Sequence, residues 1–128
     1  MVYRLAFRRL HHYDPSAVGI PIPVTLSAGH ESLSLLANLD TGSSVCLFRK
    51  DHGEVLGLQL ERGIRQRIRT ATGALETFGH TVWLAVFGMQ FDVVVYFAAS
   101  PDITRAVLGR TGFLDRVSLA LIDYDRNL

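Results

Sequence analysis

The tripeptide Asp40-Thr41-Gly42 places a carboxylate on a tight turn directly after the largely apolar residues 35–39. Two serines follow and add hydroxyl groups to the same turn. A carboxylate at the end of an apolar strand is costly to desolvate unless hydrogen bonds or an opposite charge compensate it. Asp, Gly and Ser are also ordinary turn residues, so an Asx-type turn that closes a hairpin is the structural alternative. Acid chemistry at Asp40 is the functional alternative, and the flanking sequence favours it.

A second signal lies in the C-terminal part of the sequence. The apolar residues 106–108 lead into Gly109-Arg110, and residues 111–116 are typical of a short helix. Asp-Thr-Gly-Ser-Ser after an apolar strand, together with this apolar-apolar-Gly-Arg motif, resembles the retropepsins, the retroviral-type aspartic proteases, and their bacterial relatives. The resemblance extends over residues 20–124. It implies an all-β half-barrel of the acid-protease type, with one or two short helices, that works as a homodimer.

The resemblance implies a role for each residue of the turn. Asp40 would be catalytic in each subunit, and the Thr41 hydroxyl would reach the partner's backbone and tie the two loops together. Gly42 would let the backbone approach the substrate closely, because glycine has no Cβ. Ser43 would donate a hydrogen bond to the carboxylate. Such a bond favours the charged form, so it would move the working pH to the acid side.

The resemblance also implies a flap and a supporting loop. Residues 69–78 lie where the flap of the family closes over substrate, although this segment has one glycine where viral flaps have several. The expected flap tip consists of Ala71, Thr72, Gly73 and Ala74. The expected supporting loop consists of Val107, Leu108 and Gly109. Arg110 matches a structural arginine that pairs with an aspartate in the viral enzymes. Ser44 stands at the position of that aspartate in this sequence, so Arg110 is left out of the catalytic set.

The chemistry of peptide hydrolysis predicts a dimer. Water must lose a proton to a base while the amide carbonyl gains one from an acid, and two carboxyl groups that share one proton can do both. The sequence supplies one Asp-Thr-Gly, and its other aspartates lack a following Thr-Gly or Ser-Gly. A twofold axis brings a residue face to face with its own copy. If the protein is an active enzyme, homodimerisation therefore follows from the reaction.

Composition predicts a single domain, residues 1–128. With 128 residues and 48% hydrophobic residues, the chain is long enough to bury a core. Its 13 basic and 12 acidic residues leave a net charge of +1, which points to neither nucleic acid nor anionic membranes as partners. No run approaches the roughly 18 apolar residues of a membrane span. The N-terminus has no long apolar segment of the signal-peptide type, so we expect a cytoplasmic protein.

Hydrophobic alternation and glycine turns predict an all-β barrel or folded sheet. The expected strands are residues 20–26, 32–39, 64–69, 75–87, 91–97 and 117–124, with turns at 27–30, 71–74 and 88–89. Two prolines confine the first strand to an edge or to a strand start. A short helix is expected from Asp51 as N-cap to Gly57 beyond the C-terminus, with Glu54 completing a capping box. Trp83 is expected in the core.

Three functions remain open at this point. The favoured function is an aspartic endopeptidase that acts on a peptide or protein substrate and needs no cofactor. The second is a non-catalytic dimeric module that binds peptides or other proteins on the same fold. A metal-dependent hydrolase has little support, because the five histidines show no metal-ligand spacing. The arginines at 65, 67 and 69 are more typical of a solvated strand face than of a selector for acidic substrates.

Overall fold

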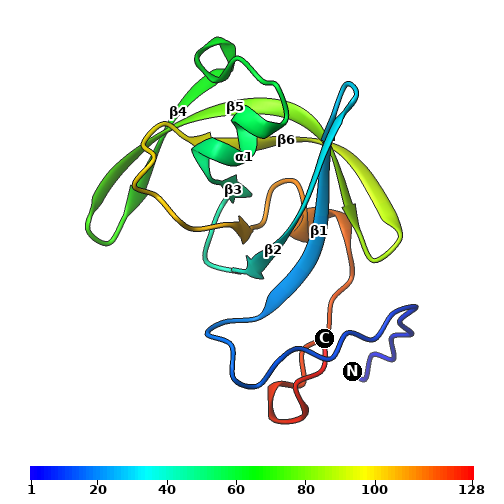
Figure 1. Cartoon of the computed structure of the whole chain (residues 1–128). Coiled ribbons are helices and arrows are strands. Elements are labelled where there is room, and N and C mark those ends of the chain that lie inside the picture. The colour runs from blue at the N-terminus through cyan, green and yellow to red at the C-terminus, as the bar shows by residue number, and fades with distance from the viewer.

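The computed structural model describes all 128 residues and contains one seven-stranded sheet that closes on itself (Figure 1). The strands are β1 (Pro21–Ala28), β2 (Glu31–Leu39), β3 (Leu47–Phe48), β4 (Ile64–Thr70), β5 (Gly73–Val86), β6 (Met89–Ala98) and β7 (Val107–Leu108). Their order is β1-β2-β7-β3-β6-β5-β4, and β1 also pairs with β5. This last pairing turns the sheet into a barrel and confirms the predicted all-β class.

Helical structure is limited to four short pieces. They are α1 (Lys50–Val55) and the 3-10 helices η1 (Leu60–Arg62), η2 (Leu114–Arg116) and η3 (Asp123–Asp125). None of the helices has the length and apolar character needed to cross a membrane.

The core fills the barrel because alternate residues of the long strands point inward. The inward positions are Ile22, Val24 and Leu26 of β1, Val82, Leu84 and Val86 of β5, and Val93, Val95 and Phe97 of β6, all of them buried. The same alternation turns Trp83 outward, and its side chain is 51% exposed. The expectation that Trp83 belongs to the core is therefore wrong.

The two prolines of β1 lie in the half of the strand that has one neighbour. β1 pairs with β2 along its whole length. It pairs with β5 only from Thr25 to Ser27, beyond Pro21 and Pro23. A proline cannot donate to a ladder, so the sequence permits a second partner only after the prolines.

Helix α1 starts two residues earlier than predicted and is capped differently. Its N-cap is Arg49, whose backbone N–H donates to Nδ1 of His52 at 3.2 Å. The carboxylate of Asp51 instead accepts two hydrogen bonds from the Arg49 guanidinium, at 2.9 and 2.6 Å. Asp51 as N-cap and Glu54 as its capping partner are therefore wrong. Gly57 follows the C-cap with φ +73°, as predicted.

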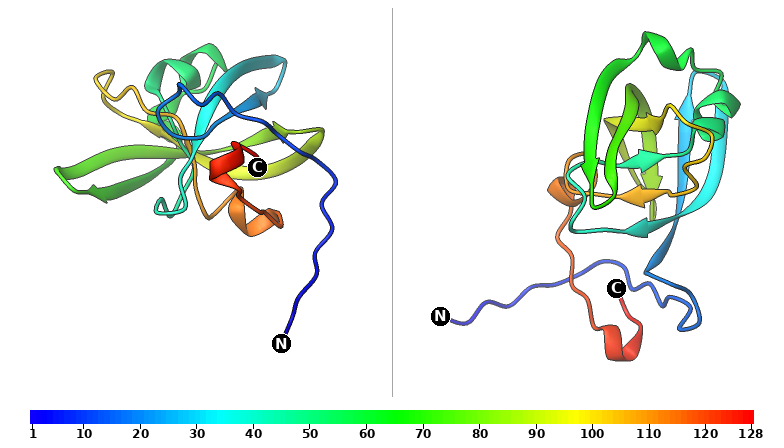
Figure 2. Two further views of the ribbon diagram at one scale, coloured as in Figure 1. Left: turned by 90° about the horizontal axis from the view of Figure 1, so that it is seen from below. Right: turned by 90° about the vertical axis from the view of Figure 1, so that its left-hand side faces the viewer.

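The predicted strand at 117–124 does not form. Residues 117–122 run outside every strand, and the chain then turns through η3. The C-terminus pairs with the N-terminal segment instead, since His11 and Leu128 exchange backbone hydrogen bonds of 2.7 and 2.8 Å. Figure 2 shows both termini on the same side of the barrel, outside it. The alternating apolar pattern does not become a strand here, because the chain turns back so that Ile122 pairs with Asn127, and the chain end pairs with residues 11 and 12.

Residues 11–13 and 122–128 pair with one another, and we call them the terminal hook. The hydroxyl of Tyr13 anchors this hook by donating a hydrogen bond to the carboxylate of Asp123. That bond lowers the pKa of Asp123 from its usual value, while burial and the bond to Asp123 raise the pKa of Tyr13. An acid whose pKa is lower in the folded state stabilises the fold above its unfolded pKa. This contribution is lost as the pH falls through the folded pKa.

We predict that Tyr13→Phe loosens the hook at neutral pH. The expected result is faster amide hydrogen exchange at His11 and Leu128 than in the parent protein, with barrel amides unchanged. The difference should shrink once Asp123 is protonated, because the parent protein has then lost the same charged acceptor. Tyr124→Phe is the matched control, since Tyr124 is exposed and makes no side-chain hydrogen bond. Equal protection in the parent and in Tyr13→Phe would contradict the assignment.

Candidate active site

Asp40 follows the last residue of β2, and backbone pairing fixes its position. β2 and β7 are parallel, with Asn38 opposite Val107 and Leu39 opposite Leu108. The ladder continues one step further, because the Asp40 N–H donates to the Leu108 carbonyl at 2.9 Å. Main-chain bonds of this kind hold the acid at the point where the strand leaves the barrel.

The turn orients the carboxylate of Asp40. The Gly42 N–H donates to Oδ1 of Asp40 at 3.0 Å, and the Ser43 N–H donates to the Asp40 carbonyl at 3.2 Å. A Cβ on Gly42 would lie 3.3 Å from the same Oδ1, so glycine keeps this close approach open. The motif is an Asx-type turn, yet it closes no hairpin, because the chain continues to β3 rather than back along β2.

Ser43 does not make the hydrogen bond expected of it. Its hydroxyl donates to the Val45 carbonyl at 2.7 Å and therefore stabilises the loop after the turn rather than the carboxylate. The acid shift expected from Ser43 has no structural basis. Thr41 is exposed, and its hydroxyl makes no hydrogen bond within the chain.

Residues 109–111, which follow β7, hold the loop after Asp40 in place, and we call them the clamp. The N–H groups of Arg110 and Thr111 donate to the carbonyls of Ser43 and Ser44 at 2.9 and 3.0 Å. A Cβ on Gly109 would lie 2.1 Å from the Val45 carbonyl oxygen, so only glycine fits between the two segments. Val107 and Leu108 are buried beside it. The segment expected to support the turn is thus in direct backbone contact with it.

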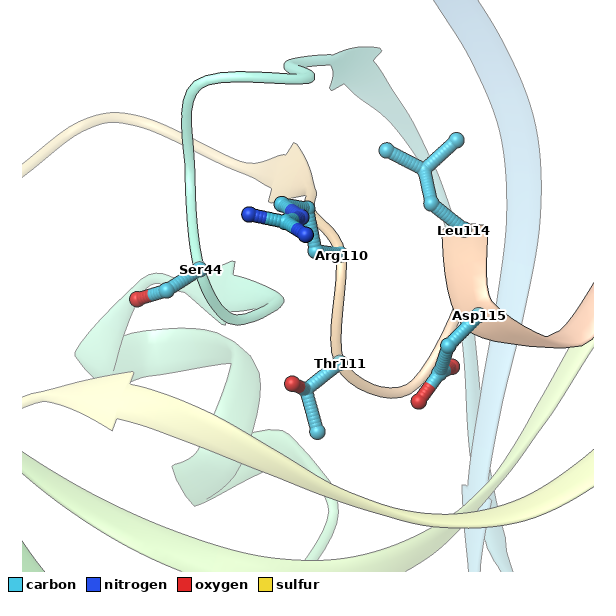
Figure 3. A pocket seen from close by; sticks show the side chains of 5 residues that line it. All are labelled: Ser44, Arg110, Thr111, Leu114 and Asp115. Atoms are coloured by element: carbon cyan, nitrogen blue, oxygen red, sulfur yellow. The ribbon is translucent and has the colours of Figure 1, made fainter.

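Arg110 lines a small cavity between this clamp and η2 (Figure 3). The cavity has a volume of about 320 Å³ and is lined by Ser44, Arg110, Thr111, Leu114 and Asp115. Arg110 makes no ion pair within the chain, which agrees with the absence of an acid at position 44. Asp40 does not line this cavity.

Asp40 opens into a larger cleft of about 640 Å³. Its apolar lining consists of Val18, Leu35, Leu36, Leu39, Ala106 and Val107. Its polar and charged lining consists of Asn38, Asp40, Arg49, His52, Thr104 and Arg105, and Gly19 completes the wall. The Asp40 side chain is 33% exposed and is the only carboxylate in the lining. One chain therefore provides a single carboxylate to this cleft.

Arg105 is a residue of this cleft that sequence reasoning missed. Its Nη2 lies 3.5 Å from Oδ2 of Asp40, and its side chain is 64% exposed. It lies in the irregular connection between β6 and β7. No hydrophobic periodicity and no motif in that segment marks this arginine as functional. Only the pairing of β7 with β2 brings it beside the acid.

A hairpin of β4 and β5 spans the residues for which a flap is expected, with its turn at residues 71–72. β5 pairs with β6 only from Thr77 onward, and the Glu76 carbonyl accepts one further hydrogen bond from the Ala99 N–H at 2.9 Å, so residues 73–75 have β4 as their sole backbone neighbour. This free part of the hairpin extends beyond the barrel (Figure 1). Ala71 and Thr72 form the turn, whereas Gly73 and Ala74 already belong to β5. The expectation that Gly73 forms the tip is wrong, although its φ of +146° requires glycine there.

The hydrogen bonds and the burial of the histidines described here and of the cysteine are typical of structural residues. His11 and His80 make hydrogen bonds to backbone carbonyls, and His12 to the side chain of Asn127. Burial lowers the pKa of His52 and raises the pKa of the Cys46 thiol to about 11. No group of three or more His, Cys, Asp or Glu side chains is arranged to hold a metal ion.

Comparisons with known proteins match this geometry to solved structures. The sequence matches no protein-family model, and it has no significant match among curated proteins. EIAV protease in complex with the inhibitor HBY-793 is 23% identical, with a TM-score of 0.63 over 84% of this chain and 98% of that chain. A retropepsin-like aspartic protease from Rickettsia conorii is 19% identical, with a TM-score of 0.65 over 91% and 93% of the two chains. The chain has the retropepsin-like fold.

This result confirms the resemblance that the two sequence motifs indicate. The match covers almost the full length of both solved structures. At identities of 23% and 19% the likeness extends to the fold and not to the role of any residue.

We predict that Gly109→Ala destabilises the protein by roughly 1–3 kcal/mol, because the new methyl group overlaps the Val45 carbonyl and the loop must move. Gly42→Ala should change the free energy of unfolding by only about 0.5 kcal/mol, since Gly42 is exposed and its Cβ would have a single neighbour at 3.3 Å. Urea denaturation of the two variants measures both values. Equal losses of stability would show that Gly109 is not a close contact of the turn.

Proposed function

We propose that the protein is a homodimeric aspartic endopeptidase. The observation that carries the proposal is the Asp40 carboxylate, which a backbone turn orients toward a cleft with apolar walls. Clefts of this size with a few placed polar groups are typical of ligand sites. The two solved structures of the same fold are described as proteases, and one of them carries an inhibitor.

A second copy of the chain would complete the site. Each chain places one carboxylate in the cleft, and a twofold axis beside Asp40 would bring its copy opposite. The free hydroxyl of Thr41 is available to donate to the backbone of the other subunit, as the sequence motif suggests. The terminal segments also leave large apolar side chains exposed, which favours burial against a partner. They are Met1, Val2, Tyr3, Leu5, Phe7, Leu10, Leu121, Ile122 and Tyr124.

The two carboxyl groups would work with one proton between them. The ionised Asp40 takes a proton from water as the water oxygen bonds to the peptide carbonyl carbon, and the protonated copy gives its proton to the carbonyl oxygen. The tetrahedral intermediate then collapses. The C–N bond breaks, the nitrogen receives a proton from one carboxyl group, and the other takes the proton of a hydroxyl as the new carbonyl forms. The pair again holds one proton, so no cofactor is consumed.

The hairpin of β4 and β5 would serve as the flap over this site. Its outer residues, Ala71, Thr72, Gly73 and Ala74, are all exposed and have only β4 and β5 to hold them. A segment with so few contacts can move, and a closed flap excludes water and offers backbone hydrogen bonds to an extended peptide.

We predict that Asp40→Asn lowers the cleavage rate of an unstructured protein substrate by roughly 10²–10⁴-fold, because the variant keeps the shape of the turn and loses the titratable group. Sedimentation should show an unchanged dimer. Activity that survives in Asp40→Asn would exclude this carboxylate as the catalyst. A parent protein that forms the dimer and cleaves nothing at any pH would favour the peptide-binding module.

We predict that Thr41→Ala weakens the dimer while Thr41→Ser leaves it nearly intact. Each lost hydroxyl leaves a partner group unpaired, at a cost of about 1–3 kcal/mol, and a symmetric dimer loses two of them, so the dimer dissociation constant should rise by roughly 30-fold or more. Sedimentation over a dilution series measures that constant. Equal constants for the parent, Thr41→Ala and Thr41→Ser would contradict the role of the hydroxyl.

A further inference from the structure

Arg105 is the one cation of the cleft whose charge has no other partner than Asp40. Its single ion pair is the 3.5 Å contact with Oδ2 of that carboxylate. The other arginine of the lining, Arg49, already holds Asp51 through two hydrogen bonds of 2.9 and 2.6 Å. His52 accepts a hydrogen bond from the Arg49 backbone, and burial lowers its pKa, which favours the neutral ring.

The charges of the completed site do not balance, and this step rests on the proposed function. A carboxyl pair with one proton carries one negative charge, while the two copies of Arg105 carry two positive charges. One positive charge beside the reacting atoms therefore remains without a partner. An arginine at the edge of a closing cleft loses water when a flap covers it, so an anionic group on the ligand would be favoured there.

We propose that Arg105 selects substrates with an acidic side chain, Asp or Glu, beside the bond to be cleaved. Arginine binds a carboxylate through two parallel hydrogen bonds, and its long side chain can move from Asp40 to a ligand group. Because the guanidinium lies next to Asp40, the side chain it holds must belong to a residue adjacent to the scissile bond. The apolar walls at Leu36 and Val107 would take the side chains of neighbouring residues.

The arginines of β4 are weaker candidates for the same role. Arg67 pairs with Glu76 at 2.7 Å on the outer hairpin, and the guanidinium of Arg65 lies over the ring of Phe78 at 5.8 Å. Neither residue lines the cleft, and both are exposed. They form the solvated strand face that the sequence suggests.

The test uses peptides that differ only in Glu or Gln beside the cleavable bond. For the parent protein we expect kcat/KM to be roughly fivefold higher for Glu, which corresponds to a partly exposed ion pair. In Arg105→Ala the ratio should fall to about one, and in Arg105→Glu it should fall below one. Arg62→Ala removes the same charge from an exposed position outside the cleft and should keep the parent ratio. A general loss of stability would lower both rates and leave the ratio unchanged.

A second measurement separates this inference from the proposed cleavage. Calorimetry would give the affinity of two non-cleavable peptide mimics, each with a tetrahedral hydroxyl group and either Glu or Gln beside it. Tighter binding of the Glu mimic that disappears in Arg105→Ala supports the inference even if the protein cleaves no peptide. Cleavage without any preference between Glu and Gln overturns the inference and leaves the endopeptidase intact. A preference that Arg105→Ala retains also overturns it.

Discussion

The parallel pairing of β2 with β7 is the contact on which the candidate site depends. It carries the ladder one residue past the end of β2, to the bond between the Asp40 N–H and the Leu108 carbonyl. The same pairing sets Gly109 against the loop after the turn and brings Arg105 beside the acid. The position of the Asp40 carboxylate, of the clamp and of the counter-ion Arg105 thus depends on one short pair of strands. A shift of β7 by one residue would move the Leu108 carbonyl, Gly109 and Arg105 relative to the turn and so displace all three contacts.

The position of the acid is the basis for the proposal that a second chain completes the site. Asp40 stands where the strand leaves the barrel, partly exposed, and no second carboxylate lines its cleft. A closed barrel has used most of its strand edges internally, so the exposed apolar side chains of the two termini are the surface that we propose a partner buries. Catalysis and assembly would then have one cause, because the symmetric contact that covers apolar surface would also supply the second acid.

The sequence predicted the features that rest on local rules. Alternation identified the long strands, glycine located the turns, and two motifs separated along the chain indicated the fold. It failed where a distant partner decides the outcome. Residues 117–124 alternate as a strand does, yet the hook formed with His11 replaces a ladder. Asp51 has the pattern of a cap, but Arg49 holds its carboxylate. The Ser43 hydroxyl donates to the Val45 carbonyl rather than to Asp40. Arg105 belongs to no motif or repeat in the sequence that would indicate its role.

Mixed dimers test whether two copies of Asp40 make one site. Parent and Asp40→Asn chains would be mixed in varying proportions at constant total concentration and allowed to exchange before activity is measured. If both carboxylates are required, activity follows the square of the parent fraction, so an equal mixture retains about a quarter of the full activity. Activity proportional to the parent fraction, about half in an equal mixture, would show that one chain suffices and would contradict the account.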